Sequence, residues 1–568
     1  MPTLCAVDRG PTQGRVRSRD AIGVVVRAAS KAVAEGGSLR KAASDLQIPS
    51  SSFAAAWTRS RALDGDAATR AFFHSPEGIL LLHGLVLALL LVLVFQEGLG
   101  VEKVRRVLVL ARLDRRVACS ASHLRGRVVA MTGMMATFDA EQKATLAPHM
   151  PHRMVYLGPD EMFRCGRMIL TAPDLVTGML LVHRIDTHRD GLTWSDAIQQ
   201  GTHGLSMTLG GLCGDRAGGI QRAAEQSLHV AYMPELFHVQ KGLRDTLGRR
   251  TRARLAAAEK ARTKATTRAL NARLGHGADG TILDPAVLPA QQVEAALALD
   301  VADHAVRDAV EDHTVVGDVT RTLARALHPV DLHTGALCDP AQVEGIVRAQ
   351  LARLDPLADR LGSGCVGAVR SARDVIPAWK DAVTQWFVRV IARVNQEGLS
   401  VDLAGVLLTV LIPACYLARV SARNHLAAVE RAYLRDRSQT MLRQVAEHPE
   451  WRDLPRDLRV HLEQVAQECV VWFVRSSSPT EGHNAWTSRR LHRHHDVRDA
   501  WLGALRVVHN FLLRRPDGTT AAQRLYGQPH GDLVQYLCAR MPLPPMPRNR
   551  PPKIRPDPLG LTERPLLV

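Results

Sequence analysis

Two carboxylates in the sequence stand where divalent metal ions could be held, and a third carboxylate occurs alone much later in the chain. Asp160 follows the apolar run RMVYLGP, and Asp215 follows a second run, MTLGGLCG. The third acid, Glu481, lies in the segment WFVRSSSPTEGHNAW at residues 472–486. Carboxylates fixed at strand ends can hold two ions about 3.5 to 4 Å apart, one activating an attacking hydroxyl and the other stabilising the leaving oxygen. These residues therefore suggest metal-dependent phosphodiester chemistry.

Each acid also has an ordinary structural interpretation. Glu161 could replace Asp160 as a ligand, although alternation along a strand would point its side chain to the opposite face. Asp215 could be the N-cap of the helix that follows it. Glu481 could be an acid favoured by the dipole at a helix start. The alternatives stay open for each residue taken singly, and the order of the surrounding elements is what favours a shared site.

Short apolar runs and turns alternate around the first two acids. Residues 152–163 predict a strand that ends in Asp160 and Glu161, and residues 164–185 predict a hairpin with a Pro-Asp turn. Further elements are expected in the order helix, strand, helix, strand, at 193–205, 206–215, 216–227 and 229–240. Because most of the remaining chain has helical patterning, the expected fold class is mixed α/β and mostly helical.

The composition is that of a basic globular protein of several domains. The 568 residues are 46% hydrophobic and 23% charged, and 73 Lys and Arg against 56 Asp and Glu give a net charge of +17. Such an excess favours a polyanionic partner, and nucleic acid is preferred over anionic lipid. The nine cysteines show no zinc-finger spacing, and no signal-peptide core is present, so a reducing cytoplasm is expected.

A helix-turn-helix pattern occurs near the N-terminus, in SLRKAASDLQIPSSSFAAAW at residues 38–57. The second helix, from about Ser50 to Trp57, would lie in the major groove of DNA. An ordinary helical hairpin is the alternative. The residues expected to contact DNA here are Arg40, Lys41, Ser50, Ser51 and Ser52.

The pattern is helical for more than two hundred residues after His238. Eleven Lys or Arg lie between Lys241 and Arg273 against two acids, an imbalance that favours a phosphate-facing surface. Trp379 and Trp386 could stack on a displaced base, but core packing is the preferred role. The phosphate contacts expected in this segment are Arg249, Arg250, Arg252 and Arg254.

The apolar run ILLLHGLVLALLLVLVF, residues 79–95, approaches the length of a membrane span. His83 lies within it, Glu77 and Glu97 flank it, and no second run of like quality follows. We therefore interpret the run as a buried core helix and expect no membrane.

The sequence resembles the DDE-type transposases of bacterial insertion sequences, whose catalytic domain has a ribonuclease H-like fold. The likeness rests on residues 38–57, on GPDEMF around Asp160, on LCGDRAGGI around Asp215, on PELFHVQKGL, and on residues 476–527, which begin SSSPTEGHNAW. The last stretch is the most specific. The resemblance implies that Asp160, Asp215 and Glu481 are the catalytic triad of acids and the ligands of two Mg²⁺ ions, with Mn²⁺ as a substitute.

The resemblance also implies partners and neighbouring contacts. Transposon-end DNA and target DNA would be bound, by a homodimer, in the nucleoid of a bacterial cytoplasm. Arg475 and Arg489 flank Glu481 and would contact DNA, although they match the family pattern only in part. The long separation of Asp215 from Glu481 resembles an insertion that some of these transposases carry. The alternative function is that of a catalytically inactive, transposase-derived DNA-binding protein or repressor.

These patterns divide the chain into seven expected regions. The expected regions are a basic tail at 1–20, a helix-turn-helix region at 21–75, a helical linker region at 76–150, the first part of a ribonuclease H-like core at 151–240, a helical insertion at 241–470, the C-terminal helices of the core at 471–530, and a Pro-rich basic tail at 531–568.

Overall fold

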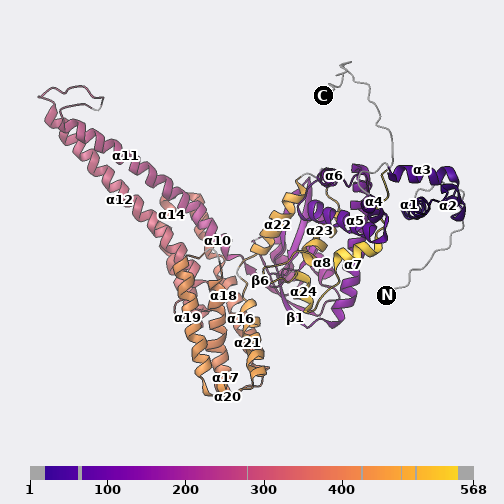
Figure 1. Ribbon diagram of the computed structural model, residues 1–568. Helices are drawn as coiled ribbons and strands as arrows, with labels where there is room; N and C mark the ends of the chain where they lie inside the picture. Colours follow the sequence, from indigo (N-terminus) through magenta and orange to yellow (C-terminus); the bar gives the residue numbers. More distant parts are fainter. Residues whose placement is uncertain are drawn as a thin grey trace.

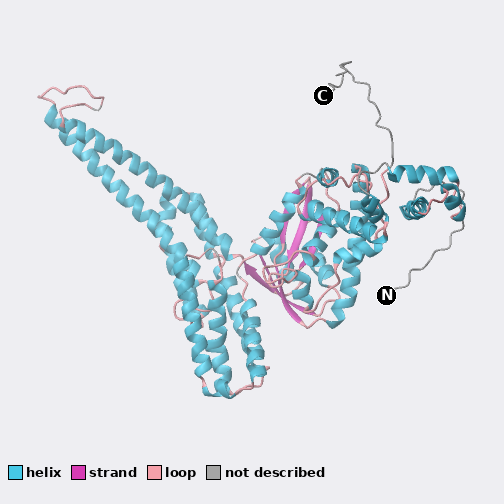
Figure 2. Ribbon diagram, in the orientation of Figure 1, coloured by secondary structure: helices cyan, strands magenta, loops and turns pink. Residues whose placement is uncertain are grey.

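A computed structural model describes most of the chain. The described residues are 19–61, 67–215, 217–277, 279–423, 426–474, 476–492 and 496–547. The expected basic tail at 1–20 lies outside them except for its last two residues, and so does the end of the expected tail at 531–568. Helices make up most of the described chain, and a few short strands complete it, so the prediction of a mixed α/β, mostly helical fold is confirmed (Figure 2).

The protein has an α/β body, a group of three helices at one end of it, and a large helical region on its other side (Figure 1). A long pair of helices, α11 (Arg249–Arg273) and α12 (Leu288–Ala326), projects away from everything else. The bundle at its base comprises α13 (Pro340–Ala352), α14 (Asp355–Leu361), α15 (Ser363–Arg373), α16 (Ile376–Asn395), α17 (Val401–Val406), η5 (Leu407–Leu411), α18 (Ile412–Ser421), α19 (Ala428–Glu447), α20 (Pro449–Asp453) and α21 (Arg456–Val471).

Two three-stranded sheets share a junction at Gly158 and Pro159. The parallel sheet has the order β1-β5-β6, and the antiparallel sheet has the order β2-β3-β4. An isolated bridge from Leu157 to Asp174 and the hydrogen bond from Gly158 N to Pro173 O (2.9 Å) continue the β2–β3 register into β1. Strands β1 and β2 are therefore two halves of one strand. The strands are β1 (Arg153–Leu157), β2 (Asp160–Arg164), β3 (Arg167–Pro173), β4 (Leu180–Asp186), β5 (Met207–Gly214) and β6 (Ala231–Pro234).

The predicted order of strand, hairpin, helix, strand, helix, strand is observed. Helix α8 (Gly191–Thr202) follows the β3–β4 hairpin, and α9 (Gly218–Arg222) with η3 (Ala223–Ser227) separates β5 from β6. One detail was wrong, because Asp160 begins β2 instead of ending the first strand. Pro159 cannot donate to a strand ladder, so the strand is interrupted immediately before the acid. A turn at Cys165, with a φ of 52°, then leads into β3.

The two faces of the parallel sheet belong to different hydrophobic cores. Val155, Leu157 and Leu212 pack with helices of the body, whereas the intervening Tyr156 and Cys213 pack with the helices that follow β6. This is the alternation expected of a strand buried on both faces. The body helices are α5 (Pro76–Leu89), η1 (Leu90–Gln96), α6 (Val101–Leu110), α7 (Ala121–Leu146), η2 (Ala147–His149), α23 (Asp499–Phe511), α24 (Ala521–Tyr526) and α25 (Leu533–Arg540).

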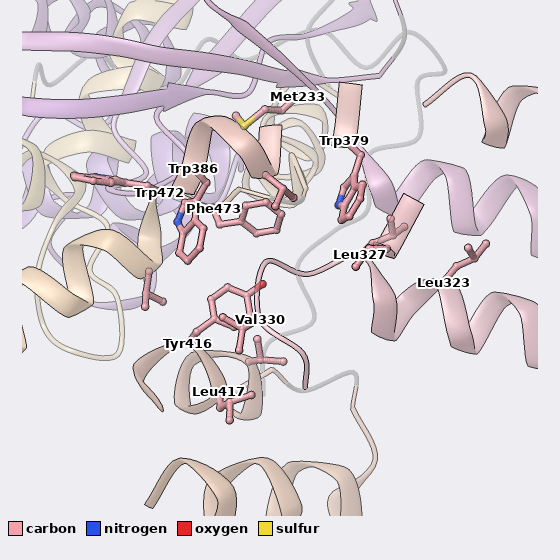
Figure 3. Packing of buried hydrophobic residues seen from close by; sticks show 14 of the residues in the cluster. Met233, Leu323, Leu327, Val330, Trp379, Trp386, Tyr416, Leu417, Trp472 and Phe473 are labelled. Carbon is pink, nitrogen blue, oxygen red and sulfur yellow. The ribbon is translucent and has the colours of Figure 1, made fainter. Parts of the chain in front are cut away.

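The inserted helices form the second core around large aromatic side chains. Trp379 and Trp386 are 1% and 2% exposed, and Trp386 Nε1 donates to Cys469 O at 2.9 Å. Figure 3 shows Met233 of β6 beside Trp386 and Phe473 in this cluster. The preferred role of both tryptophans, core packing, is therefore confirmed.

The apolar run at 79–95 forms α5 and η1, and Leu82, Val86 and Leu90 are buried in the body. This burial agrees with a core helix. Among the described residues, two helices, Pro76–Gln96 and Val401–Ser421, are long and apolar enough to cross a membrane, and 56% and 50% of their most apolar windows are buried. The expectation was of no second run of like quality, and Val401–Ser421 is the less apolar of the two helices, with a mean hydropathy of 2.0 against 2.9. Buried core helices pass such a test as well, so it carries little weight.

Three N-terminal helices surround a small core of their own. They are α1 (Arg19–Ala34), α2 (Leu39–Asp45) and α3 (Ser50–Arg61), and their buried residues include Val25, Ala43 and Phe53. Ser38 Oγ caps α2 by accepting from Arg40 N at 3.2 Å, and Gln47, with a φ of 52°, makes the turn before α3. Helix α4 (Ala67–His74) leads on into the body.

Candidate metal centre at the sheet edge

Three acids lie at the carboxyl ends of the parallel strands. Asp160 follows β1 across the Gly158-Pro159 junction, Asp215 directly follows β5, and Glu235 directly follows β6. Because β1, β5 and β6 are parallel neighbours, these positions share one edge of the sheet. Helix α22 (Ser478–Leu491), which follows the inserted helices in the sequence, places Glu481 at this edge.

Two hydrogen bonds dock the start of α22 on the β1–β2 junction. Thr480 Oγ1 donates to Gly158 O at 2.8 Å, and the Asn484 amide donates to Asp160 Oδ2 at 2.7 Å. Gly158 leaves no room for a side chain, because a Cβ there would collide with Thr480 and Leu175. The close approach therefore requires glycine at this position.

Asp160 is an acid in a site that disfavours its negative charge. Burial, and then the charge of Asp215, raise the pKa of Asp160 to about 6, while the hydrogen bond from Asn484 acts in the opposite direction. A half-buried carboxylate beside a second carboxylate is an arrangement that a divalent cation would neutralise. The two carboxylates are thus close enough for the charge of Asp215 to disfavour the ionised form of Asp160.

Asp215 does not cap the following helix. The N-cap of α9 is Ala217, and Asp215 Oδ1 accepts from Ala217 N at 3.3 Å in a local turn. The Tyr232 hydroxyl donates to Asp215 O at 2.6 Å and so fixes the backbone at the end of β5. Because Ala217 is the N-cap, the interpretation of Asp215 as an N-cap was wrong. The Asp215 side chain is exposed, and its role as a metal ligand stays a prediction.

Glu161 has a partner of its own. Its Oε1 accepts from Trp194 Nε1 at 3.3 Å, toward α8, in keeping with alternation along the strand. Burial raises the pKa of Glu161, and the charge of Asp215 contributes in the same direction. Glu161 therefore lies near the edge but is engaged by Trp194, whereas Asp160 is engaged by the helix that carries Glu481.

Glu481 contacts His238, a residue that was not among the predicted site residues. His238 Nε2 lies 3.3 Å from Glu481 Oε1 and 3.0 Å from Glu235 Oε2. In the described part of the chain, Glu235, His238 and Glu481 form the group whose potential ligand atoms all lie within 4.8 Å of one another. A Glu-x-x-His spacing at the end of a strand and the start of a helix is the sequence signal that could have identified Glu235 and His238 as a possible metal site.

The three predicted acids reach the same edge but do not form that group together. The charge of Asp215 raises the pKa of Asp160, and Asn484, one turn beyond Glu481, donates a hydrogen bond from α22 to Asp160. That Asp160, Asp215 and Glu481 share metal ions remains a prediction.

The residues expected to bind DNA have different surroundings. Arg40, Lys41, Ser50 and Ser51 are exposed, and Ser52 is partly buried. Arg249, Arg252 and Arg489 are exposed as well. Arg250 instead donates to Leu361 O, and Arg254 pairs with Asp312 at 2.9 Å, so these two guanidinium groups have partners within the protein. Arg475 lies outside the described residues.

A family of unknown function (DUF6399) matches residues 407–553, about a quarter of the chain. The matched segment includes Glu481 and Asn484 but neither Asp160 nor Asp215. No curated protein matches the chain.

Proposed function

We propose that the protein is a DDE-type DNA transposase that cleaves transposon ends and joins them to target DNA. The observation that carries the proposal is the docking of α22 on the strand of Asp160, through Thr480 and Asn484, across more than three hundred residues of sequence. This contact returns the segment around Glu481 to the edge where Asp160 and Asp215 lie.

The strand arrangement supports a ribonuclease H-like core. Taken across the β1–β2 junction, the strands follow the order β4, β3, β1–β2, β5, β6, with β3 antiparallel and β4, β5 and β6 parallel to the central strand. This is the order of a ribonuclease H-like sheet. One predicted acid then lies in the central strand and the second at the end of its parallel neighbour.

The proposed chemistry assigns a task to each residue. Two Mg²⁺ ions, held by Asp160, Asp215 and Glu481, would activate water to nick DNA and then activate the 3′ hydroxyl for strand transfer. Asn484 holds the Asp160 carboxylate in one orientation, and Thr480 fixes the start of α22. The mixed carboxylate set suits Mg²⁺, with Mn²⁺ as a substitute.

DNA binding is supported by charge and exposure. The net charge is +17, and exposed polar residues line α2 and the start of α3. We propose that α1–α3 bind transposon-end DNA, that two copies act together, and that the protein works on the nucleoid in the cytoplasm.

The test is Mg²⁺-dependent nicking of a supercoiled plasmid that carries the DNA flanking the gene. Asp160→Asn, Asp215→Asn and Glu481→Gln should each abolish nicking while DNA binding in a gel-shift assay persists. Asp196→Asn, which changes an exposed acid on α8, is the matched control and should cleave normally. Cleavage retained by any of the three variants would overturn the assignment.

The alternative function is a transposase-derived DNA-binding protein without catalysis. The contact of Glu481 with His238, away from Asp160 and Asp215, is the observation that favours it. Such a protein would bind the flanking DNA but would nick it in neither Mg²⁺ nor Mn²⁺.

A further inference from the structure

The chain leaves the sheet and returns to it at one place. Glu235 follows β6 directly, and His238 lies in α10 (Leu236–Leu243), which continues as η4 (Arg244–Gly248) into α11. The returning chain passes through Ser476 and Ser477 into α22. Glu235 Oε1 accepts from Ser477 N at 3.1 Å and from Ser476 Oγ at 3.2 Å, so the outgoing and returning segments are already in contact. We call this place the neck of the insertion.

The distances between the potential ligand atoms at the neck are those found between neighbouring ligands of a single metal ion. His238 Nε2 lies 3.0 Å from Glu235 Oε2 and 3.3 Å from Glu481 Oε1. Ligands about 2.1 Å from a metal and about 90° to 110° apart are separated by roughly 3.0 to 3.4 Å. The imidazole nitrogen therefore lies at the ligand-to-ligand spacing from each of the two carboxylate oxygens, and all three atoms lie within 4.8 Å of one another.

A second observation concerns Glu235 itself. The residue is 3% exposed, and its Oε2 is a buried atom that accepts no hydrogen bond from the described residues. A buried carboxylate oxygen without a hydrogen bond is costly, because desolvation is not compensated. Oε2 lies 3.0 Å from His238 Nε2, with which it forms an ion pair when the imidazole is protonated. A cation between them would satisfy this oxygen.

We propose that Glu235, His238 and Glu481 bind one divalent transition-metal ion, which clamps the neck of the insertion. The nitrogen ligand sets its chemistry apart from an all-oxygen site, because imidazole suits Zn²⁺, while the two carboxylates that complete the set suit Mn²⁺. The site shares Glu481 with the proposed catalytic centre, but it does not rest on the proposed function, since ion binding needs neither DNA nor cleavage.

The clamp would act on the helix that docks against Asp160. Glu481 lies in the first turn of α22, between Thr480 and Asn484, whose hydrogen bonds reach Gly158 and Asp160. An ion at the neck would therefore hold the start of α22 to α10. It would also keep Glu481 with His238 until another ligand replaces the imidazole.

The test is ion binding by the full-length protein without DNA. We expect Mn²⁺, followed by electron paramagnetic resonance, and Zn²⁺, followed by calorimetry, to bind one site that excess Mg²⁺ does not empty. His238→Ala should weaken this binding at least about tenfold, as loss of a ligand does. His304→Ala is the matched control, because His304 also stands near an acid, Asp300, on an exposed helix face.

Two further measurements keep the outcome decisive. Hydrogen exchange of residues 476–484 should slow on addition of Mn²⁺ in the wild-type protein and stay unchanged in His238→Ala, which also reports whether that variant is folded. Asp160→Asn should retain the site. Equal ion affinity of wild type and His238→Ala, or loss of the ion in Asp160→Asn alone, would overturn the proposal. Failure of DNA cleavage in the wild type would leave these results untouched and would count only against the transposase.

Discussion

Different interactions stabilise the outer part of the α11–α12 hairpin and the rest of the protein. Along α12, Ala295, Ala302 and Ala309 are buried at seven-residue intervals against α11. Farther along the same helix, Val316 and Leu323 enter the large core of the insertion. One helix thus passes from a narrow seam of alanines into a wide core. Small residues bring two helices close together but bury little apolar area, so the outer hairpin depends on local pairing.

Opposite charges on the two helices supply part of that pairing. Arg262 contacts Asp303 at 2.7 Å, and Arg268 contacts Glu294 at 2.8 Å. The basic excess between 241 and 273, which predicted a phosphate-facing surface, is therefore partly neutralised by acids of α12. The count of charges stopped at residue 273, before these acids of α12. Only the fold shows that they lie opposite the arginines of α11. Exposed pairs of this kind contribute little stability each.

The largest loss of stability is expected from a substitution in the wide core, the hydrophobic core of the insertion around Trp379 and Trp386. Trp386→Ala would open a cavity among buried side chains and remove the hydrogen bond to Cys469, so we expect a loss of about 3 to 5 kcal/mol in the free energy of unfolding. Urea denaturation followed by circular dichroism measures it. Val388→Ala, at an exposed position of the same helix, is the control and should cost far less. Equal losses would mean that this cluster is not a tightly packed core.

A smaller and local effect is expected at the alanine seam. Ala295→Leu would force α11 and α12 apart, at a cost of about 1 to 3 kcal/mol. Because the seam is remote from the wide core, hydrogen exchange should accelerate in the outer hairpin only. Ala296→Leu, one residue along and exposed, should leave exchange unchanged. Faster exchange around Trp386 in Ala295→Leu would show that the two regions unfold as one unit.

Mild acid should weaken the body before it weakens the outer hairpin. Burial lowers the pKa of His183 to about 3, so the folded body keeps this imidazole neutral, whereas the unfolded chain protonates it near pH 6.5. The unfolded state then binds the extra proton, and stability should fall as the pH decreases below about 6.5, by up to about 1.4 kcal/mol per pH unit.

Denaturation at pH 7.5 and pH 5.5 measures this dependence. His183→Gln cannot titrate and should show a smaller difference between the two pH values, whatever its absolute stability. An undiminished difference in that variant would assign the dependence to other groups. Hydrogen exchange in the outer hairpin should change little over this range, because the ion pairs that join its two helices, Arg262–Asp303 and Arg268–Glu294, involve arginine and carboxylates.

Local patterns in the sequence predicted the elements of the sheet but not every member of the site. Apolar runs and turns around Asp160 and Asp215 were sufficient for the strand order, since both signals are short in range. Glu235 and His238 were passed over, because their significance depends on Glu481, which a long insertion separates from them. Asn484 was missed for the same reason, since a lone asparagine in a helix carries no signal until its partner Asp160 is known.

The packing of Tyr156 has a consequence for how the chain folds. Its hydroxyl accepts from Arg389 at 2.5 Å, and Arg389 also donates to Gly210 O at 2.8 Å, so α16 covers a face of β1 and β5. Contacts so distant in sequence are slow to form, because a long loop must close first. During synthesis, the first strands therefore leave the ribosome with one face bare until more than two hundred further residues have followed. The newly made sheet would depend on a chaperone, or on rapid collapse of the body helices, to avoid aggregation in that interval.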